Sequence, residues 1–266
     1  MLREALQSIC AQTVTDFECI VIDDASDTAG AVLPKDPRFR LVSLESNRGL
    51  AGVWNLGVGE AIGEHVAFLD DDDLWTPQRL AIAKSHIDEA DVVVCAGSLI
   101  GSESTARFEV MNGNVHDTIL NSFTPNMGRT SIRRARMLPF DESFKASQDI
   151  EWWLRQSLEA EVVFDCRLGH LSRQHSGVRT GNGPSARIDA GHRLLAENRE
   201  YFRRHATAKA FRQYRLGMMY LVAGNLKKAW TFTISSLMSR PSGRAVRLLT
   251  RALLASFPPS RARQRR

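Results

Sequence analysis

Short runs of β-branched residues alternate with helical patterns through the first half of the chain. Strands are predicted at Phe17–Ile22, Phe39–Leu44, His65–Leu69, Asp91–Ala96 and Glu161–Asp165. Helices are predicted at Leu2–Gln12, Leu50–Ile62, Pro77–Glu89 and Ile150–Glu159, and Thr76 is the expected N-cap of the third. This alternation is typical of an α/β fold with a mostly parallel sheet and crossover helices. Such a sheet binds its ligands at the carboxyl ends of its strands.

The charge of the chain is divided unevenly along its length. Residues 1–200 carry all 30 acidic side chains against 20 lysines and arginines, whereas residues 201–266 carry 15 lysines and arginines and no acid. Beyond about residue 187 the pattern is wholly helical. We therefore expect a catalytic α/β domain over residues 1–186 and a basic α-helical region over residues 187–266. So basic a region is expected to seek an anionic surface, either phospholipid headgroups or nucleic acid.

The sequence gives no sign of a membrane span or a secretion signal. It contains no apolar run near the roughly 18 residues of a transmembrane helix, and its opening residues lack the apolar centre of a signal peptide. The four cysteines are far apart and form no C-x-x-C pair, which indicates reduced thiols rather than a zinc or redox motif. These features predict a cytoplasmic protein, soluble or peripheral on the inner face of the membrane.

Four consecutive aspartates, Asp70–Asp73, follow the apolar strand predicted at His65–Leu69. Adjacent carboxylates repel each other, so the cluster is either solvated or bound to a cation. Along an extended strand Asp70 and Asp72 would point to one side, and Asp71 and Asp73 to the other. Two oxygen ligands on one side suit Mn²⁺ or Mg²⁺ together with substrate phosphates. The alternative is a solvated turn before the next helix, and an EF-hand is excluded because its glycine and distant glutamate are missing.

A second carboxylate pair, Asp23–Asp24, ends the predicted strand Phe17–Ile22 and is followed by a turn. An acid at a strand tip can accept a hydrogen bond from a ribose hydroxyl or a base N–H. An Asx-turn is an equally good explanation of the pair taken alone.

Several of these segments, in order and spacing, resemble the family 2 glycosyltransferases over roughly residues 1–180. The matching stretches are Leu2–Thr13, Asp16–Ser26, Asn47–Gly49, Asn55–Gly57, Gly63–Trp75, Phe140–Ser143 and Asp149–Arg155. The resemblance implies the A-type glycosyltransferase fold with its Rossmann-like sheet, a nucleotide-sugar donor, of which a UDP-sugar is the first expectation, and inversion at the anomeric carbon. A nucleotidyltransferase or phosphohydrolase would be expected to show a Gly-rich phosphate loop or a nucleophilic aspartate motif, and neither is visible.

The resemblance also assigns roles to the acidic residues. It implies that Asp24 contacts the nucleobase with Asp23 beside it, and that Asn47 belongs to the donor site. Asp70, Asp71 and Asp72 would form the D-x-D element, in which Asp70 and Asp71 contact the donor, and Asp72 and Asp70 hold the metal.

Asp149 matches the catalytic base of the family. A carboxylate within hydrogen-bond reach of the acceptor hydroxyl can take its proton as the new bond forms. Without the resemblance, Asp149 would be interpreted as a helix N-cap, because it immediately precedes the predicted helix Ile150–Glu159. The two roles are compatible.

The segment Arg173–Gly177 resembles the Arg-x-His segment that closes over the diphosphate in this family. Arg173 is therefore expected to contact phosphate, and His175 phosphate or metal, although a histidine in a glycine-rich loop can equally have no role. Trp152 and Trp153 are expected to provide one core residue and one wall of the acceptor cleft.

Two departures from the family pattern affect these expectations. The usual opening strand, which ends in a Pro-x-Tyr-Asn-like turn in the interior of the sheet, is absent from this sequence. We expect either that the upstream reading frame encodes it or that the chain is a truncated, catalytically impaired nucleotide-sugar-binding protein. In addition, Trp54 stands where the family commonly has an arginine, which puts a diphosphate contact in doubt.

The basic region contains an amphipathic helical pattern at 244–257. Val246, Leu249, Leu253 and Phe257 recur on one face, and Arg244, Arg247 and Arg251 lie on the other. This helix either packs on the catalytic domain with its arginines in water or binds an anionic membrane, where lipid-linked or saccharide acceptors of cell-surface polysaccharide and glycolipid synthesis are used. No nucleic-acid-binding module accompanies the region, so no nucleic-acid partner is expected.

Overall fold

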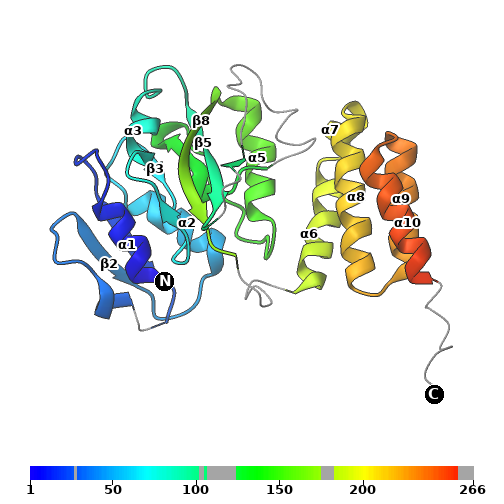
Figure 1. The fold of residues 1–266 in the computed structure, drawn as a ribbon, viewed down its shortest axis with the longest axis horizontal. Helices are drawn as coiled ribbons and strands as arrows, with labels where there is room; N and C mark the ends of the chain where they lie inside the picture. Colours follow the sequence, from blue (N-terminus) through cyan, green and yellow to red (C-terminus); the bar gives the residue numbers. More distant parts are fainter. Residues whose placement is uncertain (27–28, 102–104, 107–123, 175–182, 257–266) are drawn as a thin grey trace. The chain divides into compact units, whose positions relative to one another are not determined.

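The computed structural model describes residues 1–26, 29–101, 105–106, 124–174 and 183–256. The chain forms two compact units, one mainly from residues 1–179 and the other mainly from residues 180–266, which are coloured blue to green and yellow to red in Figure 1. The expected functional division after residue 186 stays a prediction.

The first unit contains every strand and helix predicted in the first half, with ends shifted by a few residues. Its strands are β1 (Cys19–Asp23), β2 (Phe39–Ser43), β3 (His65–Ala67), β4 (Leu74–Trp75), β5 (Val92–Leu99), β6 (Thr105–Ala106), β7 (Thr130–Arg133) and β8 (Val162–Ser172). Its helices are α1 (Leu2–Cys10), α2 (Gly49–Glu60), α3 (Arg79–Lys84) and α5 (Gln148–Glu159), with short 3-10 turns at η1 (Ala29–Val32), η2 (Met127–Arg129) and η3 (Arg134–Arg136).

The strands form two sheets. The strands β1 and β2 pair in parallel, and the larger sheet has the order β3-β7-β5-β8-β4 with β6 beside β5. In the larger sheet β5 and β8 pair in parallel, while β7 is antiparallel to both β3 and β5, so β3, β5 and β8 all run in the same direction. The α/β class expected from the sequence is confirmed, with short antiparallel strands added. Among the described residues β1 pairs only with β2, and β3 only with β7, so the sheet is divided between β1 and β3.

The core of the first unit lies against the central strands. Residues Val92–Ala96 of β5 are almost fully buried, and so are Trp152 and Trp153 of α5. Each tryptophan donates its ring N–H to a backbone carbonyl, Trp152 to Leu138 at 2.8 Å and Trp153 to Pro125 at 3.0 Å. Both are core residues, and the expectation that one of them walls an open cleft is wrong.

The start of α3 differs from the sequence prediction. The Thr76 hydroxyl donates to the Leu168 carbonyl at 2.8 Å, and Gln78 occupies the N-cap of a helix that begins at Arg79. Thr76 therefore ties this segment to β8 instead of capping the helix, because a contact between distant segments replaced the local one.

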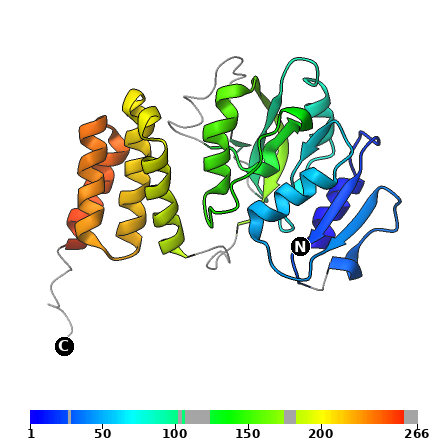
Figure 2. The same cartoon turned by 180° about the vertical axis from the view of Figure 1, so that it is seen from behind.

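The second unit is helical, with α6 (Pro184–Glu197), α7 (Arg199–Arg204), α8 (Ala206–Val222), α9 (Leu226–Ser239) and α10 (Gly243–Ser256). Figure 2 shows α8, α9 and α10 packed together. The helices α8 and α9 approach closely at Gly217, where an added Cβ would lie 2.8 Å from the Thr233 hydroxyl oxygen. Across the described part of the chain, every helix is too short or too polar to cross a bilayer.

Candidate active site

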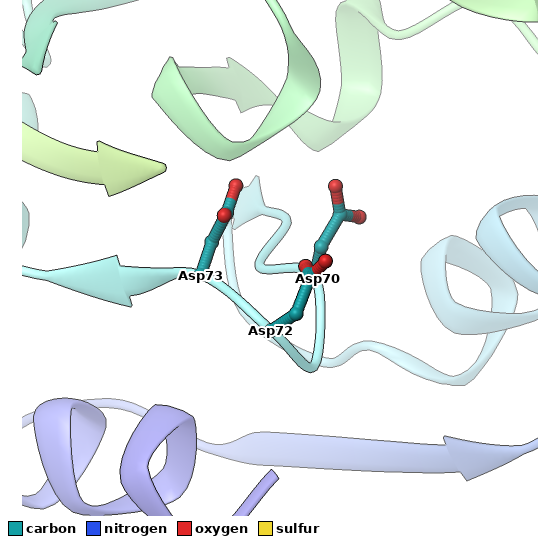
Figure 3. A group of neighbouring side chains, drawn as sticks. All are labelled: Asp70, Asp72 and Asp73. Atoms are coloured by element: carbon teal, nitrogen blue, oxygen red, sulfur yellow. The ribbon is translucent and has the colours of Figure 1, made fainter. Parts of the chain in front are cut away.

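The four aspartates lie in a turn between β3 and β4. The strand β3 ends at Ala67, and the Asp73 N–H donates to the Asp70 carbonyl at 3.2 Å, which closes a tight turn. The carboxylates of Asp70, Asp72 and Asp73 lie together, with one oxygen of each within 4.8 Å of the others (Figure 3). Asp70 and Asp72 share one side as expected. The expectation for Asp73 is wrong, because the chain has turned and no longer alternates as a strand does.

The three carboxylates differ in exposure. Asp70 is exposed, Asp72 is half-buried and Asp73 is only 6% exposed, while Asp71 is exposed and outside the group. Negative charges at this separation repel, and a divalent cation removes that repulsion. The hard oxygen ligands are those that Mn²⁺ and Mg²⁺ prefer, so the residues present fit such an ion.

The buried member of the group is fastened to the end of β8. The Asp73 carboxylate accepts a hydrogen bond from the Arg173 N–H at 2.8 Å, and His170 Nε2 lies 3.1 Å from its other oxygen. The strand β4 adds backbone pairing, with Trp75 opposite His170. The His170 ring fits only because residue 128 is glycine, since an added Cβ there would lie 2.4 Å from Nε2. Asp73 therefore fastens the turn to the end of β8, while the roles of Asp70 and Asp72 as metal ligands stay predictions.

Arg173 holds the same turn from its other side. Its Nε donates to the Asp72 carbonyl at 3.0 Å, and its Nη2 pairs with the Glu4 carboxylate at 2.9 Å. The side chain thus joins α1, the aspartate turn and the end of β8. Its predicted role as a phosphate contact stays a prediction, and His175 lies outside the described residues.

Both carboxylates of the second acidic pair accept hydrogen bonds within the protein. Asp23 is 5% exposed and accepts hydrogen bonds from the backbone and hydroxyl of Ser26, which is the turn considered as an alternative for this pair. The Asp24 carboxylate accepts from the N–H groups of Arg48 and Gly49 at 2.7 and 3.1 Å, so it caps the start of α2.

The residue Asn47 lies beside Asp24, and its side-chain amide donates to the Asp24 carbonyl at 3.4 Å. The structure thus brings Asn47 and the Asp23–Asp24 pair together at the end of β1. Their predicted roles in donor binding stay predictions.

Asp149 lies in the first turn of α5, as its second residue, after Ser147 with φ +59°. It is half-buried. The expected N-cap is wrong, because the helix begins at Gln148. An acid in the first turn still interacts favourably with the helix dipole. Its role as catalytic base stays a prediction.

Two other matching segments meet on α2. The Asn55 side chain donates to the Phe140 carbonyl and accepts from the Phe140 N–H, at 3.0 and 2.8 Å, and so holds the Phe140–Ser143 segment on the helix. Trp54 packs against Phe140 and Phe68, with ring centroids 4.7 and 5.7 Å apart. Trp54 therefore extends the aromatic core where the family commonly has a cation.

Sequence reasoning missed three basic residues that are buried in the first unit. Besides His170, these are Arg79, which donates to the Ser131 hydroxyl at 2.9 Å, and Arg129, which donates to the Cys95 carbonyl at 3.0 Å. Burial lowers the pKa of Arg79, and burial lowers the pKa of Arg129 to about 10. No periodic pattern in the sequence marks these positions. An isolated arginine is usually exposed in proteins, so the sequence alone does not predict that these side chains are buried.

Comparison with known sequences gives relatives named for polysaccharide biosynthesis. The chain is 38% identical over 116 residues to the succinoglycan biosynthesis protein ExoO of Rhizobium meliloti, covering 39% of this chain and 33% of that protein. It is 24% identical over 261 residues to the putative colanic acid biosynthesis glycosyl transferase WcaA of Escherichia coli, covering 90% and 89%. An uncharacterized glycosyltransferase of Rickettsia felis is 26% identical over 70% of this chain, which spans about a third of that protein and of ExoO.

Solved structures with the same fold are glycosyltransferases. The fold resembles that of Staphylococcus aureus TarS residues 1–349 in complex with UDP-GlcNAc, with a TM-score of 0.62 and 19% identity, covering 96% of this chain and 77% of that one. It also resembles the Pyrobaculum calidifontis mannosyltransferase PcManGT in complex with GDP-Man and Mn²⁺, with a TM-score of 0.56 and 17% identity, covering 97% and 77%. The first unit thus has the A-type glycosyltransferase fold.

A sequence model described as "Glycosyl transferase family 2" matches residues 1–144, more than half of the chain. This match covers β1, α2, β3 and the aspartate turn, which include both acidic clusters, while Asp149 on α5 lies outside it. The chain therefore belongs to glycosyl transferase family 2.

Proposed function

We propose that the protein transfers a sugar from a nucleoside diphosphate donor to an acceptor hydroxyl with inversion, and that Mn²⁺ or Mg²⁺ is held by Asp72 and Asp70. The observation that carries this proposal is the convergence of the Asp70, Asp72 and Asp73 carboxylates at the end of β3 in a family 2 chain. A bound divalent ion would neutralise the charge that grows on the leaving diphosphate.

The donor is proposed to lie between the ends of β1 and β3. Asp23, Asp24 and Asn47 are brought together at the end of β1, on the nucleoside side, and Asp70 and Asp71 face the diphosphate. Arg173 adds positive charge beside the turn, with His175 two residues further on. A UDP-sugar is our first choice of donor, which the UDP-GlcNAc bound by TarS supports.

Asp149 is proposed to act as the base. Its carboxylate would accept the proton of the acceptor hydroxyl as that oxygen attacks the anomeric carbon from the face opposite the diphosphate. Attack from that face inverts the configuration. The position of Asp149 in a regular helical turn restricts the motion of its side chain, which favours a fixed approach of the acceptor.

The acceptor is proposed to be a lipid-linked or saccharide hydroxyl in cell-surface polysaccharide or glycolipid synthesis. The names of ExoO and WcaA support this class of product. We further infer a cytoplasmic enzyme held by its basic region at the inner, anionic face of the membrane, where such acceptors are used.

The test is release of nucleoside diphosphate from UDP-sugars by the purified protein with Mn²⁺ or Mg²⁺. Asp72→Asn should abolish turnover and the metal dependence of donor binding, because it removes a direct ligand while leaving the turn bonded through Asp73. The matched control is Asp71→Asn, which should keep the metal dependence. Metal-dependent donor binding that persists in Asp72→Asn would refute the proposed metal site.

A second candidate is a nucleotide-sugar-binding protein that has lost catalysis. The division of the sheet between β1 and β3 favours it, because this division adjoins the proposed nucleoside site. This protein would show a thermal shift with nucleotide and Mn²⁺ but no turnover. A ligand at 100 times its dissociation constant stabilises a protein by about 2.7 kcal/mol, which is readily measured.

A further inference from the structure

The helix α10 has two apolar faces, and among the described residues of its unit only one of them is buried. Ala245, Leu248 and Ala252 are at most 2% exposed, and Leu248 lies beside Gly217 of α8. The apolar stripe predicted from the sequence is different, and the structure leaves Val246 and Leu253 of that stripe 51% and 46% exposed. The alternative that this stripe packs on the catalytic domain stays a prediction, and Phe257 of the stripe lies outside the described residues.

The outer face of α10 combines apolar and basic side chains in two adjacent rows. Val246 and Leu253 lie two helical turns apart in one row, and Leu254, which is 68% exposed, lies in the next row. Arg247 and Arg251 share that second row with Leu254, since they precede it by seven and three residues, and both are exposed. We call Val246, Arg247, Arg251, Leu253 and Leu254 the outer face of α10.

The charge around this face is entirely positive. No acidic residue follows Glu200 in the sequence, although 15 lysines and arginines do. In the described part of the second unit, the ion pairs join Arg193 to Glu197, and both Arg203 and Arg204 to Glu200, and none involves α10. The arginines of the outer face thus keep their full charge available for an external anion.

We propose that the outer face of α10 binds an anionic lipid surface, with Leu253, Leu254 and Val246 in the headgroup layer and Arg247 and Arg251 on lipid phosphates. The biological role of this binding rests on the proposed function, because membrane binding would bring the enzyme to a membrane-borne acceptor. The combination of apolar and basic side chains favours lipid over nucleic acid. Exposed leucines beside arginines gain free energy when they enter an apolar layer beneath the phosphates. Nucleic acid would interact favourably with the arginines through its phosphates but would not bury the leucines.

The experiment is co-sedimentation of the full chain with vesicles of phosphatidylcholine alone or mixed with phosphatidylglycerol, at low and high salt. We expect salt-sensitive binding to the anionic vesicles only. The double substitution Arg247→Gln with Arg251→Gln should weaken this binding about thirtyfold, the equivalent of ~1 kcal/mol for each basic residue. Leu253→Ser with Leu254→Ser should weaken it at least about tenfold by removing apolar burial.

Two matched controls separate a local face from general charge or hydrophobicity. Arg203→Gln with Arg204→Gln removes the same charge from α7, and Ile62→Ser removes an 83% exposed apolar side chain from the first unit. Both controls should bind vesicles within about threefold of the unaltered protein. Equal losses in control and outer-face variants would overturn the proposal, and so would equal binding to both vesicle types or salt-sensitive binding to duplex DNA alone.

Nucleoside diphosphate release without vesicles distinguishes this inference from the proposed function. The outer-face variants should turn over a UDP-sugar at the normal rate in solution while they fail to sediment. Normal turnover together with normal sedimentation of these variants would overturn the membrane face and leave the transferase intact. A protein without turnover that still sediments with anionic vesicles would support the face and refute the transferase.

Discussion

The structure gives acidic residues of similar sequence context different physical environments. Asp73 is buried and bonded to the end of β8, Asp24 caps α2, Asp70 is exposed and Asp72 is half-buried. Asp149, the proposed base, is half-buried in the first turn of α5 and is separate from these groups in sequence.

Replacing Asp149 by asparagine tests its role at the scale of one residue. Asp149→Asn should lower kcat by about 10²- to 10⁴-fold without changing the affinity for the donor, because the amide cannot accept the acceptor's proton. Steady-state kinetics with varied donor measures both quantities. Glu151→Gln is the control, since it removes another acid from the same helical turn and should lower stability but not kcat. An unchanged kcat in Asp149→Asn would leave this residue with a structural role only.

At the scale of elements, the end of β8 positions the aspartate turn. Arg173 bonds to the Asp72 carbonyl, its own N–H bonds to Asp73, and its guanidinium reaches Glu4 on α1. Arg173→Ala should therefore weaken Mn²⁺ binding, measured by electron paramagnetic resonance titration, as well as donor binding. Glu4→Gln should have little effect on either, because an exposed ion pair contributes only about 0–1 kcal/mol. Normal Mn²⁺ affinity in Arg173→Ala would show that the turn keeps its geometry without this side chain.

The segment after α3 is held on β8 by a buried carboxylate. Burial alone raises the pKa of Asp165, but hydrogen bonds from Arg167 and His86 outweigh burial and lower the pKa to about 2. The ionised Asp165 therefore stabilises the fold above about pH 4, and this contribution is lost as the pH falls towards 2.

Asp165→Asn should accordingly lower the free energy of unfolding by about 1–2 kcal/mol at pH 7. The difference from the unaltered protein should shrink below about pH 4, as measured by urea unfolding at several pH values. The matched control is Asp36→Asn, because Asp36 pairs with Arg38 at the surface with the same two-residue spacing. This substitution should lower the free energy of unfolding by less. A loss that is independent of pH would assign the effect to packing instead of charge.

At the scale of the whole molecule, each of the two units has its own core. The second unit depends on the close approach of α8 and α9, where the Ser236 hydroxyl also donates to the Ala210 carbonyl at 2.7 Å. Gly217→Ala would place a methyl group 2.8 Å from the Thr233 hydroxyl oxygen and 3.3 Å from the Ala229 carbonyl oxygen. We expect this overpacking to cost about 1–3 kcal/mol.

The binding of donor and Mn²⁺, which is assigned to the first unit, should survive Gly217→Ala. Circular dichroism melting measures the helical stability, and calorimetry measures the donor affinity. A matched control is Gly59→Ala, an exposed helical position with open space for a Cβ, where the melting temperature should not fall. Loss of donor binding in the folded Gly217→Ala protein would show that the site depends on the second unit.

The sequence by itself determined the α/β class, the longer strands and helices of the first unit, and the family, but not the short strands β4, β6 and β7. The strands and helices follow from the local periodicity of apolar residues. The family follows from short motifs at strand ends, such as Asp23–Asp24 and Asp70–Asp73, whose residues are adjacent in the sequence. It also determined that the C-terminal region is helical and basic, because charge and helical spacing are additive properties of neighbouring residues.

Only the tertiary structure decided what these residues contact. Thr76, Asp24 and Asp73 each satisfy backbone or side-chain groups far away in sequence, at Leu168, at Arg48 and Gly49, and at Arg173. The face of α10 that packs carries Ala245, Leu248 and Ala252, because the two small alanines allow close helix contact, and Leu253 and Leu254 stay exposed. Which groups a residue contacts depends on the segments that the fold brings next to it. The local pattern of the sequence carries no information about those segments.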